Sequence, residues 1–122
     1  MSPTDVLNQW ARETKAGHVD SANELLSTQS IKVTDAEGKP FRDILYNASV
    51  DLFPLKHSRE SIVGENAIVE FVGKNDSRGK FILKMERGNW RLDIAGDFDA
   101  LKTFGEWLKE TLKEPAVKIP FD

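Results

Sequence analysis

Four side chains in this sequence could carry proton-transfer chemistry. Arg91 and Asp93 stand two residues apart in the segment WRLDI, and Tyr46 and His57 precede them in the chain. Histidine exchanges protons near neutral pH, and a carboxyl or phenol group can do so when burial or a nearby charge shifts its pKa. An acid–base reaction would therefore require at least one of these side chains to face an apolar pocket.

The local pattern favours a structural role for Arg91 and Asp93. They alternate with three apolar residues of the same segment, Trp90, Leu92 and Ile94. Side chains of a strand point alternately to its two faces, so an inward apolar set turns Arg91 and Asp93 away from the core. We interpret both as members of surface pairs with Lys84 or Glu86 on a neighbouring strand, and we keep catalysis as the less favoured alternative.

His57 and Tyr46 are candidates for the rim of a pocket. His57 follows the segment FPLK, where the chain leaves a predicted helix, and loop histidines without a visible partner are usually solvated. Tyr46 lies with Asp51 on the flank of that helix. We favour a core position for Tyr46, in which its hydroxyl finds a hydrogen-bond partner.

No metal or cofactor site is expected. The chain has no cysteine, and its two histidines, His18 and His57, do not have the spacing of zinc ligands. The segment GKNDSRGK contains glycine and basic residues, but it joins two predicted strands, whereas a phosphate-binding loop leads into a helix. The sequence also lacks a calcium-loop pattern and the G-x-S-x-G turn of many serine hydrolases.

Composition narrows the class of protein and partner. The 122 residues, 39% hydrophobic and 30% charged, suit a single globular domain that spans residues 1–122. A net charge of -3 argues against nucleic acid as a partner. No apolar run is long enough to cross a membrane, and MSPTDVLNQW lacks the features of a secretory signal. We therefore expect a cytoplasmic protein, or a secreted or periplasmic one if a signal was removed.

Two helices are predicted at the start of the chain. Ser2 can cap the first helix, Pro3 suits its first position, and Gly17 can end it in the left-handed conformation. Its apolar face comprises Val6, Leu7, Trp10, Ala11 and Thr14. A shorter helix begins at Asp20 or Ser21 and ends at residues 27–30.

A strand and a third helix follow. Ile31 and Val33 alternate with polar residues, which predicts a short strand over residues 31–34 that enters a turn at residues 35–39. From Pro40 the apolar residues recur every three or four positions, which predicts a helix as far as Phe53. Pro54 then ends this helix.

The segment from residue 60 to residue 94 predicts an antiparallel meander. Extended stretches at residues 60–63, 67–72, 80–86 and 90–94 are separated by turns rich in glycine and asparagine. One face of the meander is apolar and consists of Ala67, Val69, Phe71, Phe81, Leu83, Met85, Trp90, Leu92 and Ile94. An amphipathic helix at residues 97–114 and an extended tail complete the chain.

The order of these elements resembles a known superfamily. The stretches WARETKAGHVDSANELLST, IKVTDAEGKPF and GKFILKMERGNWRLDI are similar to segments of the nuclear transport factor 2-like, or cystatin-like, superfamily, and the resemblance covers most of residues 1–95. It implies an α+β cone, in which a curved antiparallel sheet wraps around the N-terminal helices and leaves a pocket between them. The helix at residues 97–114 lies beyond the usual last strand.

The resemblance leaves the activity open. Its members include ketosteroid isomerases, scytalone dehydratases, limonene epoxide hydrolases, polyketide cyclases and non-catalytic ligand-binding or scaffold domains, so the fold does not fix the function. The segment WRLDIAGDFD, with Arg91 and Asp93, is faintly similar to the epoxide hydrolases. An isomerase, dehydratase or epoxide hydrolase is therefore one alternative, and an immunity or adaptor protein that binds through its acidic surface is another.

We predict a non-catalytic domain that binds a small apolar ligand or another protein, because few acidic or basic residues are expected to face the helices. The ligand pocket is predicted to be formed by Trp10, Phe41, Leu45, Phe71, Phe81, Met85 and Trp90. Ile68, Val72 and Ile82 are predicted to lie on the outer face of the sheet. Apolar residues exposed there predict a homodimer formed through the sheet.

Overall fold

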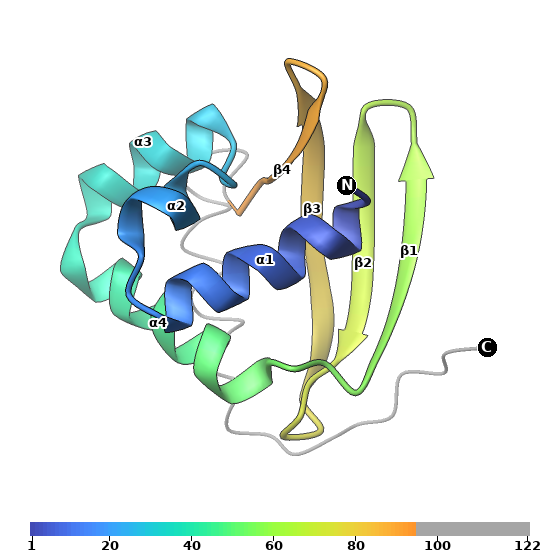
Figure 1. The fold of residues 1–122 in the computed structure, drawn as a ribbon, viewed down its shortest axis with the longest axis horizontal. Coiled ribbons are helices and arrows are strands. Elements are labelled where there is room, and N and C mark those ends of the chain that lie inside the picture. Colours follow the sequence, from blue (N-terminus) through green and yellow to red (C-terminus); the bar gives the residue numbers. More distant parts are fainter. Residues whose placement is uncertain (95–122) are drawn as a thin grey trace.

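The chain forms four helices followed by a four-stranded antiparallel sheet (Figure 1). The structure is a computed structural model, and it describes residues 1–94. The helices are α1 (Pro3–Lys15), α2 (Val19–Asn23), α3 (Thr28–Glu37) and α4 (Lys39–Leu52). The strands are β1 (His57–Val63), β2 (Asn66–Val72), β3 (Arg78–Glu86) and β4 (Asn89–Leu92). The helix and tail predicted after residue 94 lie outside the described residues.

Helix α1 forms as the sequence predicts. The Ser2 side chain accepts a hydrogen bond from the Asp5 backbone N–H at 3.1 Å, and the Asp5 carboxylate accepts one from the Ser2 N–H at 3.2 Å. This capping box satisfies amides that the first turn of a helix leaves unpaired. Gly17, with φ of 80°, follows the end of the helix. The buried face of α1 includes Val6, Leu7, Trp10 and Ala11.

The prediction of a strand at residues 31–34 is wrong, because these residues lie within α3. Ser27 caps this helix through its side-chain oxygen, which accepts a hydrogen bond from the Ser30 N–H at 3.1 Å. The buried residues of α3 are Ser30, Val33 and Thr34, which follow helical spacing. Two of these three are polar, so a pattern based on apolar residues hides the helical period.

Helix α4 confirms the predicted third helix. Gly38, with φ of 72°, separates it from α3 by a single residue, and the left-handed backbone there is accessible to glycine without strain. Phe41, Leu45, Ala48 and Leu52 are buried on one face of α4. The end of α4 contacts the turn between β2 and β3, where the Lys74 N–H donates to the Leu52 carbonyl at 2.9 Å.

The sheet has the order β1-β2-β3-β4 and confirms the predicted meander. Its register places Val69 opposite Phe81 and Ala67 opposite Leu83, and all four side chains are buried. Helix α1 packs across strands of this face and places Trp10 in the core (Figure 1). The sheet is open within residues 1–94, so the structure has an α+β architecture without a closed barrel.

Aromatic rings join the helices to the sheet. The ring centroids of Trp10 and Phe81 are 6.2 Å apart, as are those of Trp10 and Phe53. Phe71 and Phe81 stack with their centroids 5.1 Å apart. Trp90, which the sequence predicts to turn inward, is half-buried and packs against this core. The space between the sheet and α1 is therefore largely occupied by side chains.

No helix among residues 1–94 is both long enough and apolar enough to cross a membrane.

We expect replacement of Phe81 by alanine to lower the free energy of unfolding by about 3–5 kcal/mol, because the side chain is 1% exposed and its loss leaves a cavity. The matched control is Lys80→Ala, since Lys80 is the residue before Phe81 on the strand and is exposed. Its cost should be below about 1 kcal/mol. Urea unfolding followed by tryptophan fluorescence measures both, and equal costs would contradict the assignment of the two faces.

Candidate functional site

The four residues predicted to carry acid–base chemistry lie in different parts of the molecule. His57 is the first residue of β1 and is exposed, whereas Arg91 lies on β4 opposite Lys84 of β3. Tyr46 lies on α4 and is 46% exposed, which contradicts the core position favoured from the sequence. The structure does not bring these side chains together in one site, and residues 1–94 contain no group of acidic and histidine side chains arranged to hold a metal ion.

Asp93 has a structural role that the sequence did not predict. Its carboxylate accepts hydrogen bonds from the hydroxyl groups of Ser27, at 2.7 Å, and Ser30, at 3.4 Å. Ser27 and Ser30 are fully buried, so this carboxylate provides them with a hydrogen-bond acceptor away from solvent. The predicted surface pair with Lys84 or Glu86 is therefore wrong for Asp93. Leu92 and Ile94 are buried as the alternation predicts, but the side of Asp93 is covered by Ser27 and Ser30 at the start of α3 and is not free for a surface pair.

Glu86 binds the start of α3 from the end of β3. Its carboxylate accepts a hydrogen bond from the Thr28 backbone N–H at 3.0 Å, and Lys84 lies 3.6 Å away. Partial burial raises the pKa of Glu86, but the hydrogen bonds from Thr28 and the charge of Lys84 outweigh it and hold the pKa below its ordinary value. Asp93 and Glu86 thus both stabilise the junction of α3 with the sheet.

A pocket of about 280 Å³ lies among the four helices; we call it the helical pocket. Its wall is mainly apolar and includes Trp10, Ala22, Leu26 and Leu45. Trp10 and Leu45 belong to the ligand-binding set predicted from the sequence, and Tyr46 also lines this pocket. The volume is close to the lower end of the range of small-molecule pockets, which suits a small ligand.

The other residues of the predicted ligand-binding set lie elsewhere. Phe71 and Phe81 belong to the aromatic core and are at most 1% exposed, and Phe41 is buried in α4. Met85 and Trp90 are opposite each other at the β3–β4 end of the sheet and are half-buried. The structure therefore brings two of the seven residues to the helical pocket, because the space between α1 and the sheet is filled by aromatic rings.

A buried hydroxyl group in the wall of the helical pocket has no hydrogen bond. The side-chain oxygen of Thr14 is inaccessible to solvent and has no partner among residues 1–94. Thr34 lines the same pocket, and its hydroxyl donates to the Ser30 carbonyl at 2.7 Å. Buried polar groups are nearly always paired, so the Thr14 hydroxyl is an exception that requires an explanation. The sequence placed Thr14 on the inner face of its helix, but could not show that its hydroxyl lacks a partner.

Charged side chains surround the mouth of the helical pocket. Lys39 and Asp43 form an exposed ion pair with an N–O distance of 2.7 Å. Arg42 is exposed and forms no ion pair with any residue in the part of the chain that the structure describes. The pocket thus combines an apolar interior, one unpaired hydroxyl and a charged entrance.

Comparison of the chain with protein-family models, with curated proteins and with solved structures finds no match. The family resemblance read from the sequence therefore remains a prediction, and the site must be interpreted from its geometry.

We expect Glu86→Gln to make stability less sensitive to acid. The pKa of Glu86 is lower in the folded protein, so its contribution is present in full above the ordinary glutamate pKa and is lost as the pH falls through the folded pKa. Melting temperatures between pH 6 and pH 3, compared between wild type and Glu86→Gln, measure this effect. The difference in melting temperature between the wild type and Glu86→Gln should become smaller as the pH falls. A difference that is independent of pH would contradict a charge effect of Glu86.

Proposed function

We propose that this protein is a non-catalytic binding domain whose helical pocket holds a small apolar molecule with one polar group. The observation that carries the proposal is the Thr14 hydroxyl, which is buried in an apolar wall without a hydrogen bond. Leaving a polar group unpaired in the interior costs about 1–3 kcal/mol. This oxygen is inaccessible to solvent, so a ligand reaches it only after a side chain in the pocket wall moves. A ligand whose polar group then binds the hydroxyl would recover that cost and would be selected over a pure hydrocarbon.

The order of elements supports membership of the nuclear transport factor 2-like superfamily as part of this proposal. Helices precede an antiparallel meander, and the apolar face of the sheet packs against α1. We propose the cone of that superfamily as the complete fold and the cytoplasm as the site of action. The pocket itself lies among the helices and not between the helices and the sheet.

An acid–base enzyme has less support than a binding domain. Of the four candidate side chains, Tyr46 lines the helical pocket, whereas His57, Arg91 and Asp93 do not. Asp43 also lines it, but this carboxylate is at the exposed entrance and is paired with Lys39. In this proposal, neither Tyr46 nor Asp43 acts on a substrate inside the helical pocket.

We expect Thr14→Val to raise the free energy of unfolding by about 1 kcal/mol, because valine has nearly the same shape and removes the unpaired hydroxyl. Thr34→Val is the matched control from the same pocket. It should lower stability by about 1 kcal/mol, since it removes a hydrogen bond to the Ser30 carbonyl. Denaturant unfolding measures both variants, and a loss of stability in Thr14→Val would show that its hydroxyl is paired in solution.

We expect the helical pocket to bind 1-octanol in preference to octane. Titration followed by amide chemical shifts of Ala22, Leu26 and Leu45 measures the binding of each compound. In Thr14→Val, the affinity for 1-octanol should fall by roughly fivefold, which corresponds to the loss of about 1 kcal/mol. The proposal would be contradicted if neither compound shifted these amide signals. It would also be contradicted if Thr14→Val bound 1-octanol as tightly as the wild type does.

A second function, self-association through the sheet, is favoured by one observation. Ile68 and Ile82 are directly opposite each other on the outer face and are 37% and 44% exposed. No described helix covers this face, since α1 packs on the other one. Contiguous exposed apolar side chains mark interaction sites, and we propose that a second copy of the chain covers them.

We expect the full chain to be a dimer in light scattering at micromolar concentration and Ile82→Lys to be a monomer. A lysine at this position would place two buried charges in the centre of the interface. The control is Ile62→Lys, which alters an apolar residue of β1 that is 51% exposed but is paired with Ala67, on the inner side of the sheet. A monomeric wild type, or dissociation caused equally by both variants, would contradict association through this face.

A further inference from the structure

A second pocket, of about 370 Å³, lies between α1, the end of α4 and β1; we call it the α1–β1 pocket. The residues of α1 that line it include Asn8, Arg12 and Lys15, and Ser58 of β1 also contributes. All four side chains can donate hydrogen bonds. No described residue that lines this pocket carries a carboxylate, although the whole chain has a net charge of -3.

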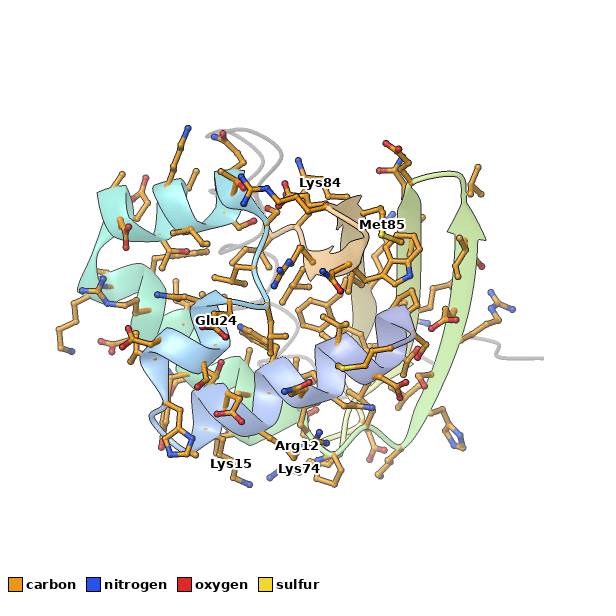
Figure 2. All side chains as sticks on the ribbon, turned by 45° about the horizontal axis from the view of Figure 1, so that its top comes forward. Arg12, Lys15, Glu24, Lys74, Lys84 and Met85 are labelled. Carbon is orange, nitrogen blue, oxygen red and sulfur yellow. The ribbon has the colours of Figure 1, made fainter. Side chains whose placement is uncertain are left out.

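The three hydrogen-bond donors of α1 lie on the same side of the helix. Asn8, Arg12 and Lys15 follow one another at four and three residues, so their side chains share one side of α1. Trp10 and Thr14 lie on another side of the same helix and line the helical pocket. Helix α1 therefore separates the two pockets. Figure 2 shows Arg12 and Lys15 along the same border of the molecule.

Four donors of the α1–β1 pocket have no partner within the described part of the chain, whereas the Ser49 hydroxyl, which also lines it, donates to the Tyr46 carbonyl at 2.6 Å. The side chains of Asn8, Arg12, Lys15 and Ser58 form neither a hydrogen bond nor an ion pair with any residue in the range 1–94. Glu13, the acidic neighbour of Arg12 in sequence, is instead paired with His18, with an N–O distance of 2.8 Å. The two positive charges are thus available to a ligand.

The opposite wall of the α1–β1 pocket is apolar. It is formed by Phe53, Pro54 and Leu55, which follow α4, whereas Ala11 adds an apolar side chain between the donors on α1. Phe53 is held in place by its contact with Trp10, and Leu55 packs against the core. A fixed apolar surface facing charged donors fits a molecule that has both a hydrocarbon part and an anionic group.

We propose that the α1–β1 pocket binds a small organic carboxylate with a flat hydrocarbon body. The carboxylate accepts hydrogen bonds from the Arg12 guanidinium and from Lys15, as charge-assisted bonds are the strongest available to it. The hydrocarbon body lies against Phe53, Pro54 and Leu55 and buries apolar surface. Asn8 and Ser58 provide further donors at the edge. This site is separate from the helical pocket and does not depend on the function proposed for it.

The test uses the full chain and benzoate, with acetate and benzyl alcohol as probes that lack the ring and the charge, respectively. Benzoate should shift the amide signals of Ala11 and Leu55 saturably, and it should bind more tightly than either of the other compounds. In Arg12→Gln, its dissociation constant should rise roughly tenfold, since a hydrogen bond between charged groups is lost. Lys15→Gln should weaken binding in the same direction.

The matched control is Arg42→Gln, which removes the same charge at the mouth of the helical pocket. It should leave the affinity for benzoate unchanged. The proposal is overturned if benzoate binds equally well to Arg12→Gln and Lys15→Gln, or if Arg42→Gln has the same effect as Arg12→Gln. It is also overturned if acetate or benzyl alcohol binds as tightly as benzoate.

Discussion

The contact between Trp10 and the phenylalanines of the core holds α1 on the sheet, and the rest of the structure depends on it. Trp10 is 1% exposed and lies 6.2 Å from both Phe53 and Phe81, measured between ring centroids. Phe53 follows α4 and Phe81 lies on β3, so one side chain of α1 contacts both the helical layer and the sheet. Each aromatic pair contributes about 0.5–1.5 kcal/mol beyond the burial of its area.

This packing decides where cavities can exist. The aromatic rings occupy the space between α1 and the sheet, which is where a cone-shaped domain would hold its ligand. The helical pocket and the α1–β1 pocket instead lie on two other sides of α1. Trp10 lines the first pocket and Phe53 the second, so the contact that closes the centre of the domain also fixes a wall of each pocket.

Buried polar groups have different roles in the two halves of the molecule. At the junction of α3 with the sheet, Ser27 and Ser30 donate to the Asp93 carboxylate, and the Ile94 N–H donates to the Ser30 hydroxyl at 3.0 Å. This network is satisfied and stabilises the structure. The Thr14 hydroxyl is also buried but has no such partner among residues 1–94, so it does not stabilise the fold in this way.

The sequence by itself determined α1, α4 and the antiparallel meander, because capping residues, glycine turns and apolar spacing act over a few neighbouring positions. It also determined which side of β2 and β3 is buried, since alternation along a strand is a local property. The sequence did not predict α3, because the buried face of this helix is mainly polar. It did not predict the hydrogen bonds of Asp93 either, because their donors Ser27 and Ser30 are more than sixty positions away. Only the tertiary structure decided which hydroxyl lacks a partner and where the pockets lie, because hydrogen bonds and gaps in packing depend on distances between residues that the sequence keeps far apart.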